Sequence, residues 1–154
     1  MSHLRMPAEW EPHEATWLAW PHREDDWPGK FAAIPWVFAE MIRHLLASEP
    51  VYLVVQDAAR EAEARTVLGQ VLPDAVLDGV RFFHCPTDRG WMRDTGPLVV
   101  RDETTRRVVD FAFNAWAKYP EYALDNQIAL SLADALEMSV IAPEVDGRRL
   151  VLEI

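Results

Sequence analysis

A tryptophan and an aspartate lie close together in the segment Trp91-Met92-Arg93-Asp94-Thr95-Gly96-Pro97. The two oxygens of an aspartate match the paired N–H donors of a guanidinium group, and an indole face attracts the same planar cation. These residue types at this spacing therefore indicate a site for a guanidinium compound. The alternative is structural, with Arg93 and Asp94 forming an ordinary ion pair in a loop and Trp91 packing in the core.

Predicted strands flank this motif and must position it. Residues 80–84 are apolar and aromatic and lead toward the motif, and residues 98–100 and 108–113 are expected to pair as a hairpin across the polar stretch 101–107. Binding residues are common on loops at the ends of strands. We therefore expect Asp94 on a loop at a strand end, with its carboxylate facing a concavity that Trp91 helps to line.

Strands and helices alternate along the rest of the chain. Short apolar runs predict further strands at residues 16–20, 51–55, 140–141 and 150–152, the last two on either side of a turn at 146–147. Apolar residues at helical spacing predict helices at residues 36–46, 58–70 and 126–138. The mixed order indicates an α/β fold, and 154 residues are enough for one domain with a substantial core.

Composition narrows the possible partners. The net charge of −10 argues against binding to the phosphates of nucleic acids and is compatible with a cationic ligand. The single cysteine allows no internal disulfide, and no apolar run is long enough for a signal peptide or a membrane span. The histidines lack cysteine partners at zinc-type spacing. We expect a cytoplasmic protein with no metal, no nucleic-acid partner and no membrane contact.

The last residues, Leu152-Glu153-Ile154, still have the character of a strand and are followed by no polar cap or turn. We therefore expect a chain truncated at its C-terminus.

Three motifs in order along nearly the whole chain resemble the agmatine deiminases and the bacterial-type peptidylarginine deiminases of the guanidine-modifying, or pentein, superfamily. They are Met6-Pro7-Ala8-Glu9-Trp10-Glu11-Pro12-His13-Glu14 with Thr16-Trp17-Leu18-Ala19-Trp20-Pro21, then residues 91–97, then Asp110-Phe111-Ala112-Phe113-Asn114-Ala115-Trp116. The resemblance implies an α/β propeller of five modules with the active site in its central channel. Residues 1–154 would be an N-terminal portion, a partial propeller of about two of the five ββαβ-type modules.

The resemblance also implies a hydrolase. Agmatine and water would give N-carbamoylputrescine and ammonia, a step of putrescine biosynthesis. A cysteine thiolate attacks the guanidinium carbon, a histidine acts as acid and base, and carboxylates grip the substrate nitrogens. No cofactor is implied. Peptidyl arginine is the alternative substrate, and residues 9–12 and 114–116 favour agmatine.

Site residues follow from the matching motifs. Asp94 is similar to the guanidinium-gripping aspartate of the family, and Trp91 to the aromatic residue beside it. Glu153 resembles the glutamate of a Leu-Glu-Gly-Gly motif, a further substrate-side carboxylate, although Ile154 replaces the first glycine. Asp94 and Glu153 are therefore the expected catalytic carboxylates.

Five further residues are expected to support this site. Trp20, Asn114 and Trp116 are candidate substrate contacts, with packing in the core as the alternative. Arg93 is expected to hold neighbouring carboxylates in place, and Asp88 to support the site or cap a loop, with a solvated position as its alternative.

The histidine, its following aspartate and the nucleophilic cysteine of the family lie in sequence that this chain does not contain. Cys85 matches no nucleophile motif, and we expect it to be buried. A Cys85–His84 dyad is the alternative, which is disfavoured because adjacent residues of a strand point to opposite faces.

We therefore expect the chain to carry the substrate-recognition half of the site and to be inactive alone. A different hypothesis is a non-catalytic module that binds guanidinium compounds or pairs with another chain. Exposed propeller edges would favour self-association.

Overall fold

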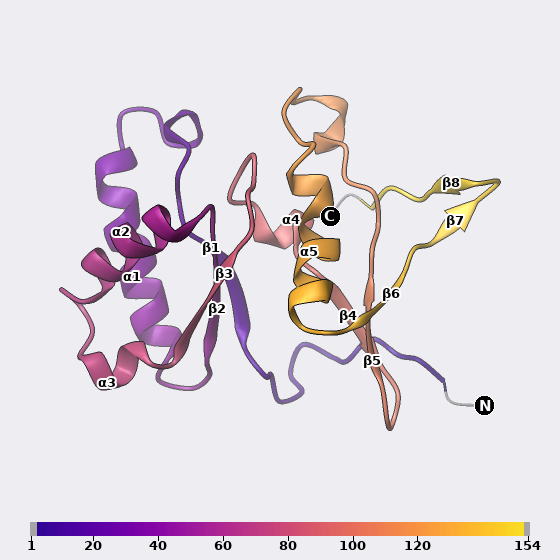
Figure 1. Ribbon diagram of the computed structural model, residues 1–154, viewed down its shortest axis with the longest axis horizontal. Coiled ribbons are helices and arrows are strands. Elements are labelled where there is room, and N and C mark those ends of the chain that lie inside the picture. The colour runs from indigo at the N-terminus through magenta and orange to yellow at the C-terminus, as the bar shows by residue number, and fades with distance from the viewer. Residues whose placement is uncertain (1–2, 153–154) are drawn as a thin grey trace. The chain divides into compact units, whose positions relative to one another are not determined.

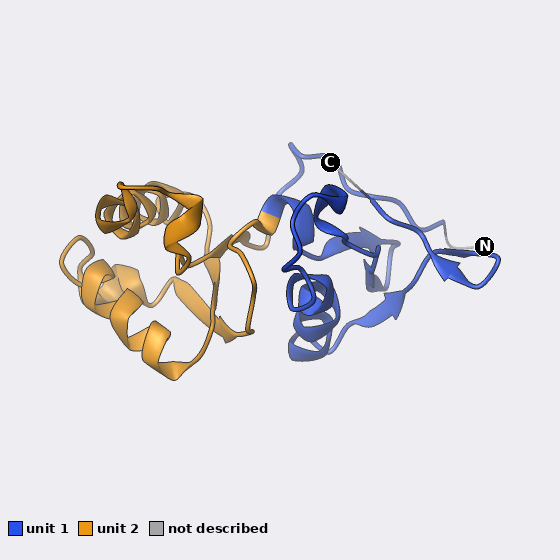
Figure 2. Cartoon of the chain, turned by 90° about the horizontal axis from the view of Figure 1, so that it is seen from above, with its two compact units in different colours: residues 1–12, 93–154 blue, residues 13–92 orange. Residues whose placement is uncertain are grey.

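The computed structural model describes residues 3–152, which form two compact units (Figure 2). Unit 2 is the continuous segment 13–92. Unit 1 combines residues 3–12 with residues 93–152.

Both units contain helices and strands (Figure 1). The helices are α1 (Ile34–Leu45), α2 (Ala58–Leu68), α3 (Asp74–Leu77), α4 (Met92–Thr95) and α5 (Ile128–Ala135). The strands are β1 (Thr16–Ala19), β2 (Val51–Val55), β3 (Val80–His84), β4 (Leu98–Arg101), β5 (Arg106–Val109), β6 (Ser139–Ile141), β7 (Glu144–Val145) and β8 (Arg148–Arg149). Short 3₁₀ turns cover Glu24–Asp26, Phe31–Ala33, Ala115–Ala117 and Asp125–Gln127. The chain therefore has a mixed α/β fold.

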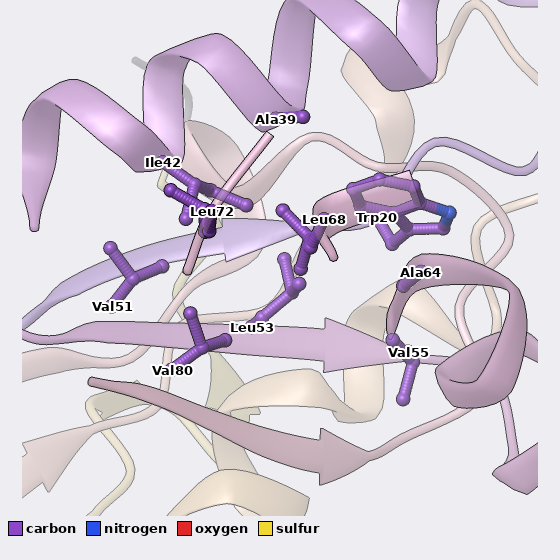
Figure 3. Close-up of a cluster of buried hydrophobic side chains, with 10 residues drawn as sticks. All are labelled: Trp20, Ala39, Ile42, Val51, Leu53, Val55, Ala64, Leu68, Leu72 and Val80. Carbon is purple, nitrogen blue, oxygen red and sulfur yellow. The ribbon is translucent and has the colours of Figure 1, made fainter. Parts of the chain in front are cut away.

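Unit 2 is a parallel sheet of order β1-β2-β3 with helices in its connections. Parallel strands need long crossovers, and α1 and α2 supply them. Alternate strand residues face these helices, so that Val51, Leu53 and Val55 pack with Ile42 and Leu68 (Figure 3). The opposite strand residues form a second aromatic group, in which the rings of Trp17, Tyr52 and Phe83 lie 4.8–5.2 Å apart.

Unit 1 contains a three-stranded sheet of order β4-β5-β6. β4 and β5 form an antiparallel hairpin, and α5 connects β5 to the parallel strand β6, which gives a ββαβ order. Ala129 and Ala133 of α5 pack against Val108 of β5. The Asp102 carboxylate closes the hairpin turn because it accepts hydrogen bonds from the backbone N–H groups of Thr104 and Thr105, both at 2.8 Å.

Residues 3–12 join unit 1 through backbone and side-chain contacts. Arg5 exchanges two backbone hydrogen bonds of 2.9 Å with Arg101 at the end of β4. The Arg5 guanidinium also donates to both carboxylate oxygens of Glu11, at 2.6 and 2.8 Å. These bonds, with one from the backbone N–H of Ala8, lower the pKa of Glu11 to about 2.

The predicted strands at 51–55 and 80–84 are confirmed, and the ends of the predicted helices lie within three residues of those observed. The C-terminal hairpin was placed wrongly. Asp146 and Gly147 both have positive φ and form a two-residue turn, so their immediate neighbours pair as β7 and β8. The predicted strand 150–152 is reduced to a single bridge between Val151 and Ala112, and residues 140–141 pair instead with β5.

Strand β5 ends at Val109, whereas the sequence predicted a strand through residue 113. The backbone changes partner there: Asp110 N–H still donates to Ile141, but Ala112 N–H donates to Leu150, both at 2.8 Å.

None of the helices in residues 3–152 has the length and apolar character needed to cross a membrane.

Candidate functional site

Asp94 lies on α4, a helix of four residues, and the expectation of a loop at this position was wrong. One helical turn is too short to show a hydrophobic period, which explains the error. The helix ends before Pro97, a residue that disfavours helical backbone in its predecessor, and β4 begins directly afterwards at Leu98. The motif thus places Asp94 just before a strand of unit 1.

The Asp94 side chain lines a small recess of unit 1, called the Asp94 recess. Its volume is about 30 Å³, enough for about two water molecules. Its lining residues are Arg93, Asp94, Thr95, Gly96, Leu98, Val109, Asp110, Phe111, Ala112, Phe113, Asp125, Asn126, Ala129 and Leu152. The recess therefore brings the aspartate motif together with the Asp110–Phe113 motif.

Burial raises the pKa of Asp94, while the charge of Arg93 and a backbone hydrogen bond oppose the shift. The ionised carboxylate is therefore less well solvated here than in water. A cation beside it would replace part of the lost solvation and lower that pKa again. Arg93 itself is exposed, and its charge lowers the pKa of Asp94 against the effect of burial, while its role in holding carboxylates in place stays a prediction.

Asp110 is a second carboxylate of the same recess and is not among the residues that the sequence indicated for the site. It is 1% exposed, and Arg149 Nη1 lies 3.0 Å from its Oδ2 atom. Burial raises the pKa of Asp110, and the Arg149 charge opposes this. The signal that could have identified it is its place in the apolar run 108–113, where a carboxylate needs a polar partner.

Trp91 belongs to unit 2 and lines a different recess, together with His22, Arg23, Asp26 and Gly90 among others. A guanidinium already faces its ring: the Arg89 carbon Cζ lies 4.9 Å from the ring centroid. Arg89 also forms a buried ion pair with Asp26. The sequence predicted a carboxylate and a tryptophan around the guanidinium of a ligand. Here Asp26 and Trp91 surround the guanidinium of Arg89, a residue of the chain itself.

The expectation that Trp91 and Asp94 line one concavity stays a prediction, because the two residues belong to different units.

The loop before Trp91 is anchored within unit 2. The Gln56 side chain accepts a bond from Thr87 N–H at 3.0 Å and donates to Thr87 Oγ1 at 2.7 Å. The backbone oxygen of Asp88 accepts a bond of 3.5 Å from Arg23.

Trp20 is 4% exposed and packs in the core of unit 2 (Figure 3). Its ring lies 6.5 Å from that of Phe38. Its backbone N–H extends the pairing of β1 by donating to Val54. This is the core alternative for Trp20, and we do not carry it into the proposed site.

Asn114 and Trp116 lie in unit 1 on an unusual turn. Ala115, Trp116 and Ala117 have φ angles of 51°, 55° and 52°, a left-handed conformation that costs about 1–2 kcal/mol for each residue with a side chain. The Asn114 side chain supports the turn by accepting a bond of 3.3 Å from Ala117 N–H. The Trp116 ring is half-buried and packs edge-on against Phe113, at 5.4 Å.

Cys85 is 4% exposed, as predicted. His84 is exposed, and its Nε2 atom lies 2.6 Å from a carboxylate oxygen of Glu61, so its ring is engaged there. These positions do not support the Cys85–His84 dyad.

Glu153 lies outside the described residues. Within residues 3–152 no group of three or more acidic, histidine or cysteine side chains could hold a metal ion.

The mixed α/β fold is shared with proteins of known structure. The family model for the Porphyromonas-type peptidyl-arginine deiminases matches residues 5–153, so the chain belongs to that family. A Selenomonas ruminantium protein named "Putative agmatine deiminase" is 38% identical over 138 residues, which are 85% of this chain and 36% of that protein.

The chain is also similar to solved structures that are described as deiminases. The agmatine deiminase of Enterococcus faecalis matches with a TM-score of 0.76 and 25% identity over 89% of this chain and 37% of its own. A structure described as a "putative peptidyl-arginine deiminase" matches with a TM-score of 0.72 and 29% identity, over 91% of this chain and 40% of its own. The chain thus spans well under half the length of these relatives.

Proposed function

We propose that this chain is the substrate-recognition part of a guanidine hydrolase of the agmatine deiminase type, with the Asp94 carboxylate as the guanidinium anchor. The observation that carries the proposal is the half-buried Asp94 in its recess, in a chain that belongs to a deiminase family. The reaction would convert agmatine and water to N-carbamoylputrescine and ammonia, a step of putrescine biosynthesis. The ββαβ order of unit 1 is consistent with one module of a partial α/β propeller.

The other expected residues have subsidiary roles in this proposal. Trp91, Asn114 and Trp116 would contact the substrate, and Glu153 would supply a further carboxylate. Arg93 tunes the charge of Asp94, and Asp88 supports the loop before Trp91. Peptidyl arginine is the alternative substrate, supported by the name of the matching family.

Agmatine is expected to bind the 154-residue chain with millimolar or weaker affinity, and Asp94→Asn is expected to weaken binding about tenfold or more. Each charge-assisted hydrogen bond contributes about 1.5–3 kcal/mol, whereas association costs at least about 4 kcal/mol, so one carboxylate leaves only weak binding. Titration followed by NMR chemical shifts measures this affinity. Putrescine, which lacks the guanidinium group, should not produce the same shifts.

Asp134→Asn is the matched control, because Asp134 is an exposed residue of α5 and the charge change is identical. It should bind agmatine like the wild type. Equal binding by wild type and Asp94→Asn would show that Asp94 is not the anchor. Micromolar affinity would show that another component completes the pocket.

The chain alone is expected to release no ammonia from agmatine, because its one cysteine is buried and lies next to a histidine that pairs with Glu61. An enzyme-coupled ammonia assay measures this directly. Cys85→Ala should leave the background rate unchanged. Turnover that disappears in Cys85→Ala would contradict the proposal and restore the dyad.

A further inference from the structure

Arg149 joins three parts of unit 1 through one guanidinium group. Besides its ion pair with Asp110, its Nη2 atom donates to the backbone oxygen of Phe111 at 3.3 Å and to Asn126 Oδ1 at 3.2 Å. The same Asn126 oxygen accepts a bond of 2.8 Å from Phe113 N–H. We call Asp110, Asn126 and Arg149 the Arg149 network, which is built around a carboxylate that is almost inaccessible to water.

The Arg149 network lies where the C-terminal segment meets the Asp94 recess. Arg149 ends β8, and the next residues run beside the Asp110–Phe113 segment: Ala112 N–H donates to Leu150 at 2.8 Å, and Val151 bridges Ala112. Leu152 then lines the Asp94 recess. Arg149 therefore lies immediately before the segment 150–152 that runs along residues 110–113 to the Asp94 recess.

The hairpin that carries Arg149 has little support of its own. The hairpin β7–β8 is labelled in Figure 1. Each of its strands has two residues, and Val145, beside the turn, is 56% exposed. A two-stranded hairpin of this size is marginal in water, so its placement depends on interactions outside its two strands. A planar guanidinium suits this task because its donors can bind several oxygens in fixed directions at once.

We infer that Asp110, Asn126 and Arg149 are positioning residues of the guanidinium site, which align residues 150–152 with the recess that contains Asp94. This inference rests on the proposed function. Asp110 and Asn126 also line the Asp94 recess, but the positioning role that we infer for all three acts through the segment that follows β8.

The test uses the complete 154-residue chain with Arg149→Gln, Arg149→Lys and the control Arg148→Gln. Arg148 is the exposed neighbour of Arg149 on β8, so its replacement changes the charge equally without touching the network. The first measurement is amide hydrogen exchange at Ala112, whose N–H bonds to Leu150, with Met138 N–H, bonded to Ala133, as an internal reference. The second measurement is the affinity for agmatine by NMR titration.

Arg149→Gln should speed exchange at Ala112 by about tenfold or more relative to Met138, because charge-assisted bonds that fix the segment are lost. It should also weaken agmatine binding severalfold. Arg149→Lys should recover only part of both effects, since an ammonium group cannot reach all the acceptors of a guanidinium. Arg148→Gln should behave like the wild type in both measurements.

Three outcomes would overturn the inference in distinguishable ways. Unchanged exchange at Ala112 in Arg149→Gln would show that the network does not hold the segment. Faster exchange with unchanged agmatine affinity would show that the network holds the segment without positioning the site. Absence of agmatine binding in the wild type would overturn the proposed function itself, and with it the positioning role, whatever the exchange rates.

Discussion

Replacing Asp26 by alanine is expected to destabilise unit 2 by about 3–5 kcal/mol, because the buried guanidinium of Arg89 loses this carboxylate. The two side chains are only 8% and 9% exposed. A charge removed from water in this way depends on its opposite charge far more than a surface charge does. The free energy of unfolding, measured by urea denaturation with circular dichroism, tests the prediction.

Asp25 provides the control, because it is the preceding residue in the same 3₁₀ turn and its side chain is 83% exposed. It lies 3.8 Å from Arg23 at the surface, where an ion pair contributes about 0–1 kcal/mol, so Asp25→Ala should change stability by no more than that. Similar losses in the two variants would contradict the dependence of Arg89 on Asp26. Asp26→Asn should lie between them, because an amide still accepts a hydrogen bond but carries no charge.

Leu53→Ala is expected to cost about 2–5 kcal/mol of stability, since it removes a fully buried side chain and leaves a cavity in the sheet–helix core. Leu53 lies on the central strand of the parallel sheet, between residues of β1 and β3. Its side chain faces the helices (Figure 3). Its neighbours come from several elements, which limits how far the core can collapse into the space. Urea denaturation again measures the change.

Met41→Ala is a suitable comparison, because Met41 lies on α1 but is 42% exposed. Its replacement should stay within roughly 0.5 kcal/mol of the wild type, as for most surface substitutions. A loss as large as that of Leu53→Ala would mean that the outer face of α1 is covered in solution.

The regular elements of this fold could be predicted where their pattern extends over a whole element. Residues 51–55 and 80–84 are apolar runs of strand length, and both strands have the predicted bounds. The elements missed were α3, α4 and the short strands β7 and β8, which have two to four residues each. Elements of this length carry no measurable period, and their geometry is decided by turn residues and by partners elsewhere in the chain.

The candidate site could be predicted in part for a similar reason. Asp94 was recognised because its motif is local, whereas the ion pairs around the two recesses join distant residues. Asp26 and Arg89 are 63 positions apart, and Asp110 and Arg149 are 39 apart. No local pattern identifies such pairs, so the guanidinium that faces Trp91 and the network that fixes the C-terminal segment became visible only in three dimensions.

The two backbone bonds between Arg5 and Arg101 have a consequence for the order in which the chain folds. Unit 2 is continuous, so all its residues leave the ribosome before the strand that residue 5 must pair with. Closing so long a loop is entropically unfavourable until the hairpin β4–β5 exists as a template. We therefore expect residues 3–12, although they are synthesised before unit 2, to reach their native position only after the β4–β5 hairpin has formed.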